Sequence, residues 1–118
     1  MKVLLVDDSS TMRRIQKTQL TNLGVDSIVE AGDGEDALSK IEGAMPLDII
    51  LLDWNMPVMD GLTFLKTIRK DAKYADVKVI MCTSESEKPK VMEALKAGAN
   101  NYIVKPFSPE ALKKKLEL

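Results

Sequence analysis

Short apolar segments alternate with segments of helical periodicity along the whole chain, and this alternation constrains the fold more than any other feature. The apolar segments are typical of buried strands, because several are unbroken runs of branched residues that end abruptly at polar ones. They comprise residues 2–6, 27–31, 49–52, 77–82 and 102–104. Between them, apolar side chains recur every three or four positions. The pattern predicts an α/β fold, in which a doubly wound, five-stranded parallel sheet carries five helices on its two faces.

The starts of the helices are marked with unequal clarity. Residues 108–110, Ser-Pro-Glu, combine an N-cap, a first-turn proline and an acid that suits the helix dipole, so they predict the start of the last helix. The fourth helix has a weaker start, because Pro89 in its first turn leaves Lys88, a poor capping residue, at the N-cap. We therefore expect a mobile loop over residues 84–88.

Length and composition limit the class of protein. The chain has 118 residues, and we expect one domain over residues 1–118. Seventeen basic residues against eighteen acidic ones give a net charge of -1, which does not favour nucleic acid or an anionic membrane as a partner. No apolar run approaches the length of a membrane span or a signal-peptide core. The one cysteine, Cys82, lies in an apolar run, which fits a buried thiol in a reducing compartment, so we expect a cytoplasmic protein.

Carboxylates stand at the ends of the first and third predicted strands. Asp7 and Asp8 follow the first strand, and Asp53 ends the apolar run of the third. For the sheet order 2-1-3-4-5, ligand sites lie outside the carboxyl ends of these two strands, where the strand order reverses. Taken singly, each aspartate suits an ordinary loop or a helix cap equally well. Placed together at separations of about 5 Å, each like-charged pair costs about 3 kcal/mol at an effective dielectric near 20, so we expect a cation there.

Mg2+ is the cation that these residues favour. The chain contains no histidine, and an all-oxygen ligand set that leaves positions for water is typical of Mg2+ rather than zinc. A protein cation is available as well, because Lys105 ends the fifth strand. It precedes Pro106, which favours an extended backbone at the lysine and makes an X-Pro bond that is able to be cis.

The combined set fits a site at which a carboxylate is phosphorylated. Asp53 would be the nucleophile, Asp7 and Asp8 would hold Mg2+, and Lys105 would pair with a phosphoryl oxygen. Thr83, at the end of the fourth strand, would donate to another phosphoryl oxygen. Because the chain has no histidine, the phosphoryl group must arrive from a partner or from a small acyl phosphate.

The ordered motifs resemble the receiver domains of two-component response regulators, and the chemotaxis members most of all. The motifs are VDDSSTMRRI, DWNMPVMDG, a threonine that ends the fourth strand, and LKAGANNYIVKPF. The resemblance covers essentially the whole chain, so it implies a single receiver domain over residues 1–118 with no output domain. It also implies a flavodoxin-like sheet with the order 2-1-3-4-5 and a monomeric protein.

The resemblance implies a role for each residue of the acidic site. Asp53 matches the phosphoacceptor, and Asp8 and Asp53 match the carboxylates that bind Mg2+ directly. The backbone carbonyl of Asn55 matches a further metal ligand. Asp7 matches the neighbouring acid, which often reaches the metal through water.

The resemblance also implies a switch and a set of partners. Thr83 and Tyr102 match a pair in which the hydroxyl moves toward the phosphoryl group and the aromatic ring turns from exposed to buried. The surface of the fourth helix, fifth strand and fifth helix then changes its partners. A histidine kinase would be the phosphoryl donor, the flagellar motor switch the target, and a phosphatase a further partner.

Several alternatives stay open at this point. Tyr102 also fits an ordinary half-buried strand aromatic. A stand-alone receiver in another phosphorelay, or a phosphate sink, would carry the same site residues. A Mg2+-dependent phosphatase with an aspartyl nucleophile shares the chemistry, but its usual DxDxT spacing on the first strand does not occur at residues 7–11. An FMN-binding module shares the sheet order, but FMN requires a Ser/Thr/Gly-rich loop where this chain has carboxylates.

Overall fold

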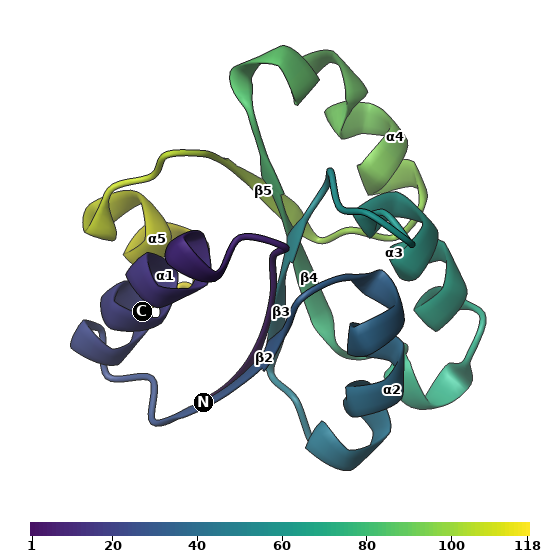
Figure 1. Cartoon of the computed structure of the whole chain (residues 1–118), viewed down its shortest axis with the longest axis horizontal. Helices are drawn as coiled ribbons and strands as arrows, with labels where there is room; N and C mark the ends of the chain where they lie inside the picture. The colour runs from purple at the N-terminus through teal and green to yellow at the C-terminus, as the bar shows by residue number, and fades with distance from the viewer.

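The alternating elements form one parallel sheet between two layers of helices (Figure 1). The computed structural model describes all 118 residues, except for the side chain of Glu85. The elements in chain order are β1 (Lys2–Val6), α1 (Ser10–Asn22), β2 (Ser27–Ala31), α2 (Gly34–Ala44), β3 (Ile49–Asp53), α3 (Gly61–Arg69), η1 (Ala72–Tyr74), β4 (Lys78–Thr83), η2 (Glu85–Lys90), α4 (Val91–Lys96), β5 (Asn101–Val104) and α5 (Pro109–Lys115). The strand order is β2-β1-β3-β4-β5, and every neighbouring pair is parallel. The predicted fold class is therefore confirmed.

Each face of the sheet has its own hydrophobic core, because successive strand residues point to opposite faces. In β1, Leu4 and Val6 pack toward α2, α3 and α4, whereas Val3 and Leu5 pack toward α1 and α5. Figure 1 shows the same division, with α1 and α5 on one side of the sheet. In the central strand β3, residues on both faces are buried, which explains its unbroken apolar sequence. The interior of β3 is thus apolar on both faces, and its one polar residue, Asp53, stands at its end.

Side-chain caps fix the start of four of the helices. The oxygen of the capping side chain accepts a hydrogen bond from the main-chain N–H three residues later, at distances of 2.7 to 3.2 Å. The capping residues are Ser9, Asp33, Asp60 and Ser108. Pro109 follows directly as the first residue of α5, as the sequence predicted.

The region before α4 differs from the prediction. The segment 84–88 was expected to be a loop, but Glu85–Lys90 form the 3-10 helix η2. Its start is closed by polar contacts, since the main-chain N–H of Ser84 donates to Oε1 of Glu87 at 2.8 Å. The helix α4 then begins at Val91 with Lys90, not Lys88, at its N-cap, and no side chain caps it. The expected weak start of α4 is confirmed, whereas the mobility of the segment stays a prediction.

Arg69, at the end of α3, forms hydrogen bonds to the segments that lead into β4 and β5. Its Nε donates to the carbonyl oxygen of Gly98 at 3.1 Å, and Nη1 donates to that of Tyr74 at 2.8 Å. Its Nη2 donates to the carbonyl oxygen of Val77 at 2.8 Å and to Oδ1 of Asn100 at 3.0 Å. The guanidinium therefore ties the segment after α4 to the chain that leads into β4. None of the helices in the described chain has the length and apolar character that a membrane crossing requires.

Candidate functional site

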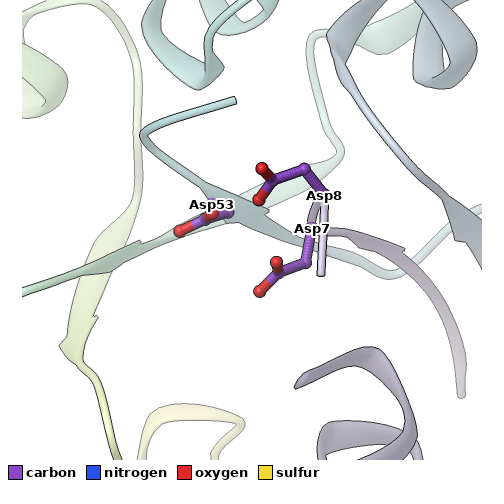
Figure 2. A group of neighbouring side chains, drawn as sticks. All are labelled: Asp7, Asp8 and Asp53. Carbon is purple, nitrogen blue, oxygen red and sulfur yellow. The ribbon is translucent and has the colours of Figure 1, made fainter. Parts of the chain in front are cut away.

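Three aspartates come together at the carboxyl ends of β1 and β3 (Figure 2). Asp7 and Asp8 follow β1, Asp53 is the last residue of β3, and the two strands are neighbours that pair Val6 with Leu52. Each residue offers one carboxylate oxygen, and these oxygens lie within 4.8 Å of one another. Asp7 and Asp53 are buried, whereas Asp8 is exposed. The predicted meeting of these three acids is confirmed.

A close approach of the main chain holds Asp53 in place. The N–H of Gly61 donates to the carbonyl oxygen of Trp54 at 2.9 Å, which folds the loop after β3 back over the strand end. A Cβ atom on Gly61 would lie only 2.2 Å from the carbonyl oxygen of Asp53, so no larger residue fits there without movement. The Asp60-Gly61 turn therefore supplies both the cap of α3 and the space that Asp53 occupies.

Lys105 supplies a positively charged side chain beside the acids. Its Nζ lies 2.6 Å from Oδ1 of Asp53 and 3.8 Å from Oδ2 of Asp7. The lysine follows β5 and reaches back across the sheet edge, and its N–H donates to the carbonyl oxygen of Thr83 at 2.6 Å. The bond between Lys105 and Pro106 is cis, an option that the sequence had raised. The predicted proximity of Lys105 to the acids is confirmed.

Burial dominates the electrostatics of Asp53. Loss of solvent raises the pKa of its carboxyl to about 6, although the hydrogen bond from Lys105 acts in the opposite direction. The negative charges of Asp7 and Asp8 raise this pKa further. For Lys105, burial lowers the pKa, but the hydrogen bond and charge of Asp53 outweigh it, so the net shift is upward. The lysine therefore stays charged, and Asp53 carries its charge at neutral pH against a substantial desolvation penalty.

The carboxylates fit a hard divalent cation. Oδ2 of Asp7 is buried and accepts no hydrogen bond in the structure, although Lys105 forms an ion pair with it at 3.8 Å. A buried carboxylate oxygen without a donor, with two further carboxylates beside it, has the charge and the geometry that a cation satisfies. The donor set is all oxygen. The three aspartates are thus a group that could hold a metal ion.

Cys82 lies closer to the acids than the sequence indicated. It is the β4 partner of Asp53 in the sheet register. Burial, and next the charge of Asp53, raise the pKa of its thiol to about 12. The thiol is thus neutral under ordinary conditions. Its expected structural role fits this environment.

The predicted switch residues lie on neighbouring strands. Thr83 is fully buried, and its hydroxyl donates to the carbonyl oxygen of Ile103 at 3.5 Å. Tyr102 is half-buried on β5, where Nζ of Lys115 lies 4.7 Å from its ring centroid. The register pairs Thr83 with Val104, so Tyr102 lies two positions earlier on the adjacent strand. Their roles as a switch, and that of the exposed Asn55 as a ligand, stay predictions.

One contact to the site was missed by the sequence reasoning. Nη1 of Arg13 donates to the carbonyl oxygen of Asp7 at 2.5 Å, while the adjacent Arg14 points to solvent. Both arginines belong to the quoted motif VDDSSTMRRI, and no local pattern distinguishes them. The usable signal is helical phase, because Arg13 lies one turn after the N-cap Ser9 and faces the end of β1.

Comparison with known proteins agrees with this fold and site. The sequence profile of the response regulator receiver domain matches residues 3–117. The chain belongs to this family of receiver domains. It is 49% identical to the chemotaxis protein CheY1 of Helicobacter pylori over 118 residues, which cover 100% of this chain and 95% of that protein. It is 52% identical to the chemotaxis protein CheY homolog of Campylobacter jejuni over 117 residues, which cover 99% and 90% of the two chains.

Solved structures show the same architecture. The chemotaxis protein CheY4 of Vibrio cholerae superposes with a TM-score of 0.89 at 40% sequence identity, covering 98% of this chain and 95% of that one. A probable two-component system response regulator/GGDEF domain protein superposes with a TM-score of 0.91 at 28% identity, but this chain spans only 48% of it. The chain is therefore a receiver domain whose full-length relatives are chemotaxis response regulators of the CheY type.

Proposed function

We propose that the protein is a signalling switch that accepts a phosphoryl group on Asp53. The observation that carries this proposal is the position of the Asp53 carboxylate, within the cluster of three acids and 2.6 Å from Nζ of Lys105. A carboxylate with a raised pKa in a largely desolvated site, beside a fixed ammonium, suits nucleophilic attack on phosphorus. Membership of the receiver domain family supports the same role.

The reaction would join an oxygen of Asp53 to phosphorus. The carboxylate attacks the phosphoryl group of a phosphohistidine or an acyl phosphate, a P–O bond forms, and the bond from phosphorus to the donor nitrogen or oxygen breaks. The donor leaves with the electron pair of that bond and takes up a proton from solvent if it is an imidazole. Water later attacks phosphorus, so that phosphate leaves and the Asp53 carboxylate is restored. The protein thus modifies itself and turns over no external substrate other than the donor.

Charge placement explains how the residues would assist. Before the reaction Lys105 pairs with Asp53, and afterwards its ammonium would pair with a phosphoryl oxygen at the same edge. Mg2+, held by Asp8, Asp53 and the backbone carbonyl of Asn55, with Asp7 acting through water, would neutralise the remaining charge on the phosphoryl oxygens. The hydroxyl of Thr83 would then leave the carbonyl oxygen of Ile103 and donate to the phosphoryl group.

The output would be a change in protein binding on the surface of α4, β5 and α5. The movement of Thr83 would open space for the half-exposed ring of Tyr102 to turn inward. The same surface carries exposed apolar side chains on α4, since Met92 is 61% exposed and Leu95 36%. Because the relatives are named as chemotaxis proteins, a histidine kinase is the proposed donor and the flagellar motor switch the proposed target. A phosphatase would be an additional partner.

Intact-mass measurement after treatment with acetyl phosphate tests the proposal. We expect one phosphoryl adduct that requires Mg2+ and does not form on Asp53→Asn. The matched control is Asp76→Asn, which removes an exposed carboxylate elsewhere and should keep the adduct. The absence of an adduct on the wild-type protein at every Mg2+ concentration would contradict the proposal. An adduct without any change in partner binding would instead favour a phosphate sink.

A further inference from the structure

We propose that Arg13 is a positioning residue for the metal site, because its guanidinium fixes the main chain from which the Asp7 and Asp8 side chains project. This inference rests on the proposed function only in that it assumes a divalent cation among the acids. Arg13 itself touches neither the cation nor the phosphoryl group. It acts through the carbonyl oxygen of Asp7.

The contact between Arg13 and Asp7 is short and charge-assisted. Nη1 donates to the carbonyl oxygen of Asp7 at 2.5 Å, and the side chain of Arg13 is only 20% exposed. A hydrogen bond from a guanidinium is roughly twice as strong as one between neutral groups, and its planar fork also fixes direction. The bond therefore restrains the orientation of the peptide unit that joins Asp7 to Asp8.

Glu30, on β2, holds the other side of the same guanidinium. Nε of Arg13 lies 3.3 Å from Oε1 of Glu30, and Nζ of Lys17 lies 3.4 Å from the second oxygen of that carboxylate. The register places Glu30 beside Leu5 of β1, two residues before Asp7. Arg13 thus links helix α1, strand β2 and the end of β1, so it is held before any cation binds.

The other polar atoms of Asp7 also form hydrogen bonds, with one exception. Its N–H donates to the carbonyl oxygen of Ala31 at 3.2 Å, and its Oδ1 accepts from the N–H of Ser9 at 2.9 Å. Among these atoms only the buried Oδ2 lacks a hydrogen bond, and it lies 3.8 Å from Nζ of Lys105. These bonds, with that of Arg13, orient the free oxygen toward the site.

Asp8 depends on Arg13 more than Asp7 does. Its carboxylate is exposed and, within the described part of the chain, accepts no hydrogen bond that would orient it. Its direction is therefore set by its main chain, whose preceding carbonyl is the one that Arg13 holds. Loss of the guanidinium would let this peptide rotate and would spread the positions of the Asp8 carboxylate.

An electrostatic role and a positioning role of Arg13 predict opposite changes in Mg2+ affinity when its guanidinium is removed. A cation near an acidic site repels Mg2+, so a purely electrostatic role predicts that Arg13→Gln binds Mg2+ more tightly. A positioning role predicts weaker binding, because the ligands must then be ordered when the metal binds. The sign of the change in affinity separates the two roles.

Arg14 provides a matched control. It is the next residue of the same helix and carries the same charge, but its side chain is exposed. Among the described residues, no hydrogen bond or ion pair engages its guanidinium. Arg14→Gln therefore removes an equal charge from α1 without disturbing the carbonyl of Asp7.

The experiment is a Mg2+ titration of the full chain at fixed pH and ionic strength, followed by isothermal calorimetry and by the fluorescence of Trp54, the residue after Asp53. We expect Arg13→Gln to weaken Mg2+ binding by roughly tenfold, as is typical when a residue that orients a metal ligand is lost. Arg13→Lys should recover part of the affinity, since an ammonium can donate to the same carbonyl without the fork. Arg14→Gln should bind Mg2+ nearly as the wild type does.

The possible outcomes distinguish this inference from the proposed function. Unchanged or tighter Mg2+ binding by Arg13→Gln would overturn the positioning role and leave the proposed function intact. Failure of the wild-type protein itself to bind Mg2+ in either assay would overturn both. Circular dichroism and a urea midpoint check that the variants are folded. If Arg13→Gln does not fold, the milder Arg13→Lys decides: Mg2+ binding weaker than that of the wild type would support the inference, and equal affinity would overturn the proposal that the guanidinium positions the site.

Discussion

Replacing Asp53 by asparagine would test the electrostatics of the site without any phosphoryl donor. Asp53 is only 5% exposed, and burial raises the pKa of its carboxyl from 3.8 to about 6 despite the hydrogen bond from Lys105. A carboxyl whose pKa is higher in the folded than in the unfolded protein destabilises the fold when it is ionised. The penalty is absent below the unfolded pKa, grows between the two values, and is complete above the folded one. Removing the charge should therefore stabilise the protein at neutral pH.

The pKa shift of Asp53 gives the expected size of this gain in the free energy of unfolding. Each pKa unit corresponds to about 1.4 kcal/mol, so the shift from 3.8 to about 6 amounts to about 3 kcal/mol. Asparagine has nearly the same shape, and its amide oxygen still accepts a hydrogen bond from Lys105. We expect Asp53→Asn to exceed the wild type by about 2 to 3 kcal/mol at neutral pH without divalent cations, or roughly 10 °C in Tm. Near about pH 4 the two proteins should be similarly stable.

Urea unfolding in EDTA, followed by circular dichroism across this pH range, measures the effect. Asp76→Asn is the control, because its carboxylate is exposed and its loss should bring no comparable gain. Added Mg2+ should stabilise the wild type more than Asp53→Asn, since only the wild type keeps all three carboxylates. The reasoning would be refuted if Asp53→Asn were no more stable at neutral pH, or if its advantage did not change with pH.

The remaining predictions concern packing, charge and reactivity at the same edge of the sheet. Gly61→Ala should lower the free energy of unfolding by about 2 to 4 kcal/mol, because its Cβ would lie 2.2 Å from a carbonyl oxygen. In the same urea experiment Gly43→Ala, with no atom within 4 Å, should be neutral or stabilising by up to about 1 kcal/mol, and equal losses would contradict the steric argument. Lys105→Met should raise the pKa of Asp53 further, since it removes the ion pair at 2.6 Å; carboxyl 13C NMR would detect a higher titration midpoint, and an unchanged midpoint would disprove the coupling. Cys82 should react with iodoacetamide only after unfolding, because it is buried and its thiol pKa is about 12, and rapid labelling of the folded protein would show that the thiol is accessible.

Local patterns in the sequence predicted the elements and the meeting of the acids well. The third strand was expected to end at Asp53, and β3 does so. The burial of a strand can be predicted from its sequence, because successive side chains face opposite layers of helices. The strand order then places Asp7 and Asp8 beside Asp53 whatever the identity of those residues, which is why topology alone anticipated the cluster.

Contacts made by long side chains were harder to anticipate. Arg13 and Arg14 are chemically identical neighbours, and only the three-dimensional position of the Asp7 carbonyl separates their roles. The 3-10 helix η2 was missed for a related reason, since Pro89 and Lys88 indicate a poor start for an α-helix. Closure of η2 depends on the turn of Glu87 back to the N–H of Ser84, which is a matter of local geometry and not of periodicity.

The contacts of Arg69 hold one end of helix α4 more firmly than the other. At its C-terminal end, the guanidinium of Arg69 on α3 donates hydrogen bonds to Gly98 and Asn100, which follow α4. At the other end, α4 begins at Val91, directly after η2, and its N-cap residue Lys90 makes no capping hydrogen bond through its side chain. We therefore expect that a displacement of Thr83, as proposed for the phosphorylated protein, would move the start of α4, where Met92 lies, more than the end held by Arg69. If the proposed switch operates, Arg69 would hold the end of α4 farthest from the acids while the start of the helix moves.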